Sequence, residues 1–342
     1  MRRRTCTKLL ALVLGVMVLA GPAVQAHARV LVKLGTLAPE GSVWHDALLE
    51  VRQKWLAITG GEVELRVYAG GVLGGEDEMV RKLQRRSLDA VAISGGGLPH
   101  VDDSVEVLNI PLLFESYEEL DYVRDRVAPE LERHLEARGF KVLNWTDAGW
   151  VYFFTKSPVR TPDDLRQLRL WISSGSPEAE ELFHKFGLRV VPLPVTEMLT
   201  GLQTGLIEAI DVPPLFALLD GSYRLAGYMT DLPWAPVNGA VVISNRTWQS
   251  IPAKYHEALL ASIRAIAGVA QAKIREAGEQ SIAEMRSRGL NVITLDPETL
   301  DLWRREAHAA YPALRASTGH PELFDEVLRL SAEYKNTKTG SN

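Results

Sequence analysis

The sequence predicts an α/β protein built from two lobes, and three observations support this expectation. Short apolar segments with strand patterning alternate with segments of helical spacing, as is typical of sheets with parallel crossovers. The alternation begins again after residue 150, which indicates a second α/β unit. Residues 252–288 then read as one helix of about 35 residues, roughly 50 Å long. Because this length exceeds a single domain, we expect the helix to bridge two lobes.

The first half of the chain begins with an apolar strand over residues 30–37 and a helix over residues 44–58. Apolar side chains recur at helical spacing along this helix, and a Gly-Gly pair ends it. The recurring residues are Trp44, Leu48, Val51 and Trp55. The other strands expected in this half are residues 63–68, 90–94 and 141–144, and the other helices begin near residue 76 and span residues 116–139.

The second half repeats the alternation with shorter elements. The expected strands are residues 151–155, 169–172, 190–191, 209–212 and 241–244. The expected helices are a short one from Pro162, residues 177–186, residues 194–204 and the long helix, whose only weak points are Gly268 and Gly278. No internal sequence repeat or low-complexity linker separates the two halves.

The N-terminus has the three parts of a secretory signal peptide. A basic segment, Arg2 to Lys8, precedes the apolar residues 9–20, and Val24-Gln25-Ala26 fits a small-residue cleavage site. We therefore expect residues 1–28 to be removed and the protein to be free in a bacterial periplasm. The alternative is an uncleaved membrane anchor. Beyond residue 25 there is no run of about 20 apolar residues, so the mature chain is not expected to span a membrane.

Composition and charge narrow the class of protein further. Of the 342 residues, 46% are apolar and 24% are charged, which excludes a disordered or collagen-like chain. Removal of residues 1–28 leaves 34 basic against 43 acidic residues, so the formal net charge moves from −5 to −9. A protein this acidic is a poor nucleic-acid binder, and no such partner is expected. Cys6 leaves with the signal, so neither a disulfide nor a thiol nucleophile is expected.

Motifs for catalysis and cofactor binding are missing from the sequence. It has no phosphate-binding loop, no Gly-x-Ser-x-Gly elbow and no His-Glu-x-x-His pair. Asp102-Asp103 and Asp163-Asp164 are better interpreted as loop and helix-start acids than as catalytic pairs. We therefore expect no enzymatic activity, no cofactor and no bound metal.

Three segments carry a resemblance to a known family. They are residues 73–80 (LGGEDEMV), residues 108–114 (LNIPLLF) and residues 161–209, which open with TPDDL and close with LQTGLIEA. In order and spacing, the chain from Arg29 to about Tyr334 resembles the DctP-like substrate-binding subunits of tripartite ATP-independent periplasmic (TRAP) transporters. The resemblance implies a periplasmic-binding-protein-like fold, with two α/β lobes joined by hinge strands and a long helix. It also implies one small-molecule ligand in an interlobe cleft and membrane permease subunits as partners.

The sequence departs from this family at three polar anchor positions. Trp171 stands where relatives carry the arginine that binds a ligand carboxylate, Val151 replaces a second arginine, and Val212 replaces an asparagine. Burying a carboxylate without a partner costs several kcal/mol. We therefore expect a hydrophobic or amphipathic ligand. A ligand with an ammonium group is also compatible with this site, because the cation can face the indole ring of Trp171.

Twelve residues are candidates for ligand contact. They are Trp44, Glu76, Gly95, Trp150, Val151, Phe153, Trp171, Asp211, Val212, Phe216, Trp234 and Asn238. Two roles stay open for Trp171, whose indole faces either the cleft or the core. Glu76 is either a capping acid or a ligand contact, and Asn238 could donate a single hydrogen bond.

Other functions remain as alternatives. The ligand could be an organic acid held by Arg169 or by a bound cation, the protein could be a ligand sensor for a signalling partner, or it could be an exported α/β enzyme. For the two lobes we expect residues 29–148 with 237–276, and residues 149–236 with 277–334. Residues 335–342 are expected to form a flexible tail.

Overall fold

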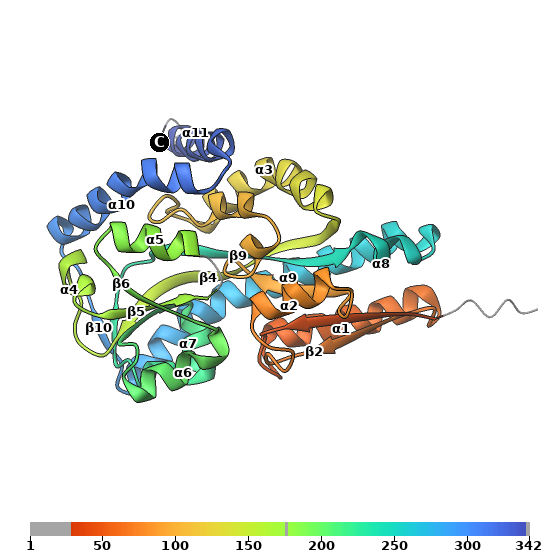
Figure 1. Cartoon of the computed structure of the whole chain (residues 1–342), viewed down its shortest axis with the longest axis horizontal. Helices are drawn as coiled ribbons and strands as arrows, with labels where there is room; N and C mark the ends of the chain where they lie inside the picture. The colour runs from red at the N-terminus through yellow and green to blue at the C-terminus, as the bar shows by residue number, and fades with distance from the viewer. Residues whose placement is uncertain (1–28, 175–176, 340–342) are drawn as a thin grey trace, which may run out of the picture.

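The computed structural model describes residues 29–174 and 177–339 (Figure 1). The predicted signal segment, with Cys6, lies outside the described residues. Within them, no helix is both long enough and apolar enough to cross a membrane. The two α/β lobes predicted from the sequence are confirmed. A continuous run of paired strands connects them, in the order β2-β1-β3-β9-β4-β7-β5-β6.

The first lobe is built on parallel strands that helices connect. The strands are β1 (Val30–Thr36), β2 (Val63–Tyr68) and β3 (Ala90–Ser94), and the connecting helices are α1 (Val43–Thr59) and α2 (Glu76–Gln84). Local sequence sets the limits of α1. The Ser42 hydroxyl accepts a hydrogen bond from the His45 N–H at its start, and Gly60 ends it with a left-handed φ of 59°. Trp55 on α1 is completely buried against the sheet.

The second lobe repeats this arrangement with shorter elements. Its strands are β5 (Arg169–Ser173), β6 (Arg189–Leu193), β7 (Ala209–Val212), β8 (Tyr228–Thr230) and β10 (Asn291–Ile293). Its helices are α4 (Pro162–Arg166), α5 (Pro177–Lys185), α6 (Val195–Thr204) and α7 (Pro214–Asp220), followed by the 3-10 turn η3 (Ser222–Arg224). At the start of α4, Thr161 and Asp164 form a capping box.

Two long strands cross between the lobes. The sequence predicts separate strands at residues 141–144 and 151–155, but the structure has one, β4 (Phe140–Thr155). Its antiparallel partner β9 (Ala235–Ser244) supplies the ladder that keeps the intervening segment extended. A register break between Asp147 and Trp150 accommodates Gly149, which has a φ of 96°. Beyond this break β4 pairs with β7 in the second lobe.

The long helix is α9 (Ala253–Ser287), which has 35 residues. It packs on α1 of the first lobe, on β4, and on α7 of the second lobe. The predicted bridging role is therefore confirmed. A short helix, α8 (Asn245–Ser250), precedes it, and the Ser244 hydroxyl caps that helix.

The C-terminal helices cover both lobes. α10 (Pro297–Ser317) packs on α4 and α5, and α11 (Pro321–Thr339) packs on α3 (Tyr117–Ala137) of the first lobe (Figure 1). The 3-10 turns η1 (Leu98–His100) and η2 (Asp103–Leu108) lie between β3 and α3. Residues 335–339, predicted as tail, continue α11. There the Lys335 ammonium donates a hydrogen bond of 2.9 Å to the Leu113 carbonyl.

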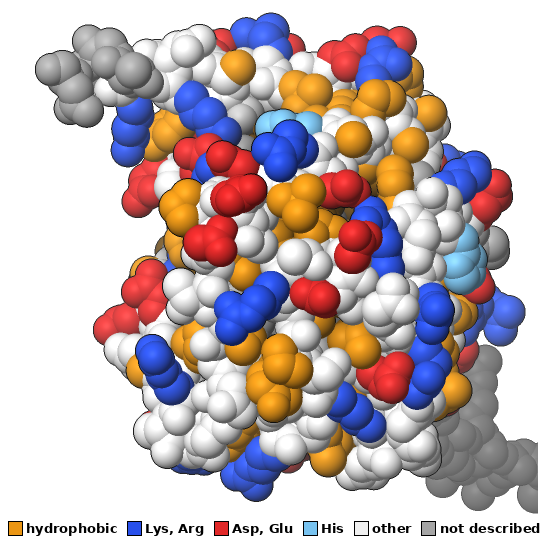
Figure 2. Space-filling view, turned by 90° about the vertical axis from the view of Figure 1, so that its left-hand side faces the viewer, with side chains coloured by type: hydrophobic (Ala, Val, Ile, Leu, Met, Phe, Trp, Pro, Cys, Tyr) orange, Lys and Arg blue, Asp and Glu red, His pale blue; other side chains and the backbone are white. Residues whose placement is uncertain are grey.

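The surface charges are mixed on the side of the molecule that carries α4 and α10. Figure 2 shows acidic and basic side chains interspersed over this face, with small apolar areas between them. Interspersed charge of this kind is typical of a solvated surface rather than of a nucleic-acid footprint.

Candidate ligand-binding site

A cavity of about 500 Å³ lies between the two lobes. Its lining includes Thr36, Ser94, Ser173 and Val212, the last residues of β1, β3, β5 and β7. Ligands of open α/β sheets bind at these carboxyl ends. The bridging helix α9 closes one side through Ala270 and Ile274. The volume is in the range that holds a small organic molecule.

Nine of the twelve residues predicted from the sequence line this cavity. They are Trp44, Glu76, Gly95, Val151, Trp171, Asp211, Val212, Phe216 and Trp234. They come from both lobes, so the fold brings together segments that are far apart in the chain.

The other three predicted residues do not line the cavity. Trp150 directly follows the register break in β4. Its side chain is on the opposite face of the strand from that of Val151, and its ring packs against Tyr117 at 5.7 Å between ring centroids. Phe153 is buried behind the cavity wall, between Trp234 and Trp303. Asn238 points into the first lobe, where its Nδ2 donates to the Leu108 carbonyl at 2.9 Å.

Trp171 combines the two roles that the sequence left open. Its indole is only 7% exposed and belongs to a buried cluster with Met198 and Leu202. The indole Nε1–H donates a 2.9 Å hydrogen bond to the Leu193 carbonyl of β6, which fixes the ring plane. The same residue lines the cavity. Trp171 therefore forms a rigid apolar part of the wall, at the position where the family resemblance implied an arginine.

Arg169 does not reach the cavity, which corrects the sequence-based alternative that assigned it as an anchor. Its guanidinium lies at the opposite end of β5 and donates to the carbonyls of Leu206 and Gly205 at 3.0 and 2.6 Å. It also pairs with Glu208 at 3.2 Å. These contacts cap the loop before β7, so the Arg169 side chain is committed to the outer surface.

Glu76 is held in place by the end of β3. Its Oε1 accepts from the Ser94 N–H at 2.7 Å, and its Oε2 accepts from the Ser94 hydroxyl at 2.8 Å. A Cβ at position 97 would approach a Glu76 oxygen to 2.8 Å, so Gly97 is needed for this packing. Burial raises the pKa of Glu76 and outweighs the two bonds from Ser94. Glu76 is thus both a structural contact and part of the cavity wall.

Asp211 is a half-buried acid of the wall. Burial raises the pKa of its carboxyl group to about 7, and only its own backbone N–H acts in the opposite direction. Among the described residues, no side chain donates a hydrogen bond to the Asp211 carboxyl group. A buried carboxylate without a cation is the expected cause of such a shift. Asp211 is therefore available to a donor or a positive charge on a ligand.

Sequence reasoning missed several polar residues of the lining. They are His100, Glu106, Asn109, Asn144 and Asp147. Burial lowers the pKa of His100, which favours the neutral imidazole. Across residues 29–174 and 177–339, four carboxylate side chains line the cavity, those of Glu76, Glu106, Asp147 and Asp211, but no lysine or arginine does. The ionisable side chains of the lining are thus mainly acidic.

Comparison with known proteins identifies the class. The family described as bacterial extracellular solute-binding protein, family 7, matches residues 34–317. The 2,3-diketo-L-gulonate-binding periplasmic protein YiaO of Escherichia coli is 25% identical over 69% of this chain and 72% of its own length. The C4-dicarboxylate-binding periplasmic protein DctP of Rhodobacter capsulatus is 26% identical over 82% of both chains.

Solved structures show the same fold. A TRAP periplasmic solute-binding protein of Xanthobacter autotrophicus, with bound β-D-galacturonate, has a TM-score of 0.81 and 20% identity, covering 88% of this chain and 99% of its own. One from Sulfurospirillum deleyianum, with bound succinate, has a TM-score of 0.79 and 20% identity, covering 87% and 97%. The chain is an extracellular solute-binding protein rather than an enzyme. It belongs to family 7, as a DctP-like TRAP solute receptor.

Proposed function

We propose that this receptor binds a hydrophobic or amphipathic small molecule. In the described part of the chain, its cavity lacks the arginine that would anchor a carboxylate of the ligand. The observation that carries the proposal is the cavity lining, which is mostly apolar and includes four carboxylates but, within the described residues, no lysine or arginine. An organic acid in this cavity would bury its charge beside like charges. Burial of a carboxylate without a partner costs several kcal/mol, and about 4 kcal/mol is roughly a thousandfold in affinity.

A positively charged head group would fit the acidic lining. Asp211 is a half-buried carboxylate without a cationic partner among the described residues, and Trp44, Trp171 and Trp234 line the same cavity. An ammonium group is stabilised both by a charge-assisted hydrogen bond to a carboxylate and by a cation–π contact with an aromatic face. We therefore favour a ligand with an apolar body and a basic nitrogen. Relatives that bind sugar acids or succinate are too distant to assign their ligands to this chain.

The cellular setting follows from the family and from the N-terminal sequence. We propose that residues 1–28 direct export, that the mature receptor works in the periplasm, and that it delivers its ligand to TRAP permease subunits. A sensor that presents its ligand-bound form to a signalling partner is the alternative. A permease gene pair or a kinase gene beside this gene would separate the two.

We also propose a revised lobe division. The first lobe comprises residues 29–148, 237–276 and 321–339, and the second comprises residues 149–236 and 277–320. The change from the sequence-based division moves α11, because Phe324, Val327 and Leu330 share a buried cluster with Leu120 of α3.

Mass spectrometry of small molecules released from the denatured receptor tests the ligand class. We expect lipid-like, aromatic or amine-bearing material from the wild-type protein. The Trp171→Arg variant should lose it, because the substitution places a cation in the apolar wall. Trp171→Phe is the matched control and should retain it, since it keeps an aromatic ring. A sugar acid or dicarboxylate recovered from the wild type would contradict the proposal.

A further inference from the structure

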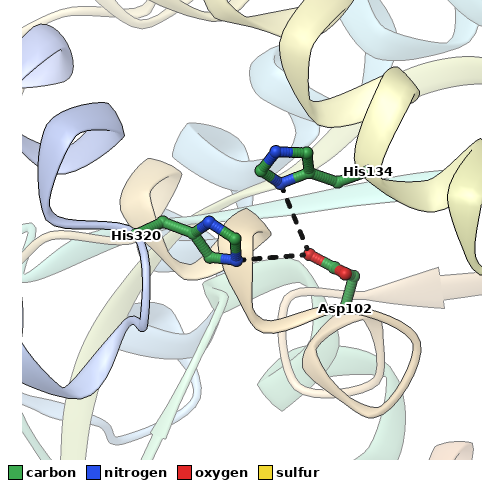
Figure 3. A group of neighbouring side chains, drawn as sticks. All are labelled: Asp102, His134 and His320. Atoms are coloured by element: carbon green, nitrogen blue, oxygen red, sulfur yellow. Dashed lines mark ion pairs between the residues drawn. The ribbon is translucent and has the colours of Figure 1, made fainter.

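A cluster of two histidines and one aspartate lies where the first lobe meets the turn between α10 and α11. Figure 3 shows Asp102, His134 and His320 pointing toward one another from three separate elements. Asp102 is the cap of η2, His134 lies in the last turn of α3, and His320 lies in the turn between α10 and α11. They are far apart in the sequence, which is why no motif reveals them.

The spacing of the three side chains suits a metal ion better than direct hydrogen bonds. His134 Nδ1 and His320 Nε2 each lie 3.8 Å from Asp102 Oδ1, and the three ligand atoms all lie within 4.8 Å of one another. A separation of 3.8 Å is too long for a hydrogen bond. Ligands at about 2.0–2.1 Å from a tetrahedral zinc ion are about 3.3 Å apart, so a small inward shift would complete the geometry. Asp103 Oδ1 lies 3.3 Å from His320 Nε2 but is not one of these three ligands, so a fourth position would be left to water.

The hydrogen-bonding state of His134 is the independent observation. Its Nδ1 is buried and has no hydrogen-bond partner among the described residues. Its other ring nitrogen, Nε2, lies 3.2 Å from Glu130 Oε1. A carboxylate on the far side of a histidine ring holds the proton there and leaves the opposite nitrogen free to bind a metal. His134 is therefore oriented as a metal ligand with a supporting carboxylate already in place.

The Asp102 carboxylate is also held in a fixed orientation by neighbouring donors. The Ser104 N–H donates to Oδ1 at 3.1 Å and the Arg138 guanidinium donates to Oδ2 at 3.0 Å. Within residues 29–174 and 177–339, Arg138 is the one arginine that pairs with Asp102 or Asp103, so negative charge remains for a cation.

We propose that Asp102, His134 and His320 form a structural site for zinc or a similar divalent transition metal, with Asp103 adding negative charge beside His320. Two imidazole nitrogens with carboxylate oxygens are a ligand set that suits Zn²⁺ and disfavours Mg²⁺ or Ca²⁺. The bound ion joins η2 and α3 to the α10–α11 turn. Ser317 and Thr318, just before this turn, line the ligand cavity. The metal therefore secures one wall of the cavity as well as the packing of α11.

Calorimetric titration of ZnCl₂ into the full mature chain tests the proposal. The protein carries no histidine tag and is first treated with a chelator. We expect one Zn²⁺ per chain and a rise of the thermal midpoint by about 3 °C or more at a hundredfold excess over Kd, with no response to Mg²⁺. Co²⁺ in the same site should give the visible absorption of a tetrahedral complex.

Variants decide whether these residues are the ligands. His134→Gln and His320→Gln should each weaken Zn²⁺ binding at least tenfold, and Asp103→Asn, at a half-exposed position that leaves the fold intact, should weaken it severalfold. His308→Gln, an exposed histidine of α10 outside the cluster, is the control and should bind as the wild type does. Absence of stoichiometric binding in the wild type, or unchanged binding in all three cluster variants, would overturn the site.

Discussion

Replacing Arg275 with methionine is expected to lower the free energy of unfolding by about 3 kcal/mol, because it leaves the buried Asp147 without its main cation. Arg275 Nη2 lies 2.6 Å from Asp147 Oδ2, and its Nη1 lies 2.7 Å from Asp121 Oδ2. The Asp147 side chain is completely buried. Chemical denaturation of the wild type and the variant measures the difference.

The position of this ion pair explains the size of the effect. Arg275 is on the bridging helix α9, Asp147 is at the register break of β4, and Asp121 is on α3. The network therefore joins the element that spans both lobes to the strand that crosses between them. Burial acts to raise the pKa of Asp121, but Arg275 and Arg124 outweigh it and hold that pKa below its ordinary value. The carboxylate is thus ionised at neutral pH and depends on these cations.

A surface arginine supplies the control. Arg329 makes two ion pairs of 2.7 Å, with Glu326 and Glu333, but its side chain is 57% exposed. Exposed pairs contribute about 0–1 kcal/mol, so Arg329→Met should change stability by less than about 1 kcal/mol. Equal losses in the two variants would mean that the buried network has no special role.

The sequence predicted the fold well because its signals are local. Apolar periodicity located α1 and α9, and the glycine after α1 ended it where expected. The single strand β4 was missed because its continuity depends on pairing with β9, almost 100 residues later in the chain, rather than on its own residues. Long-range pairing of this kind leaves no local pattern around Gly149.

Nine of the twelve candidate residues line the cavity, and the positions of the others have physical causes. Trp171 was located through its position in the family, but its second role in the core depends on the Leu193 carbonyl of a neighbouring strand. Trp150 was assigned to the cavity because side-chain direction beside a register break cannot be read from alternation. Asp147 was not predicted as a lining residue, because a buried acid can be identified only together with its cationic partner. That partner, Arg275, lies far away in the sequence on α9.

The acidic lining should be visible in the pH dependence of ligand binding. Three probes share one body and differ only in the head group: 4-phenylbutylamine, 4-phenylbutanol and 4-phenylbutanoate. At pH 8 we expect the amine to bind at least tenfold more tightly than the alcohol, and the carboxylate to bind most weakly, because Asp211 favours a positive charge. Calorimetric titration of each probe gives the order directly, and tighter binding of the carboxylate would contradict the assignment.

The sign of the pH effect follows from the raised pKa of Asp211. A cation binds the ionised carboxylate, whose fraction falls tenfold per pH unit below a pKa of about 7, while the alkylamine stays protonated. Amine affinity should therefore fall by tenfold or more from pH 8 to pH 5, to about the affinity of the alcohol. Glu76 and His100 line the same cavity, and their protonation acts in the same direction.

Asp211→Asn separates Asp211 from these neighbours. The variant should bind the amine and the alcohol about equally at pH 8, and most of the pH dependence should disappear. Because the pKa of Asp211 is about 7 in the folded protein and near 3.8 when unfolded, its ionisation destabilises the ligand-free fold as pH rises from about 4 to 7. An asparagine at this position cannot ionise, so the variant avoids this destabilisation. It should be more stable than the wild type at pH 8 by at least about 1.4 kcal/mol, the equivalent of one pKa unit. A variant that loses stability at pH 8 and keeps the amine preference would show that another group recognises the cation.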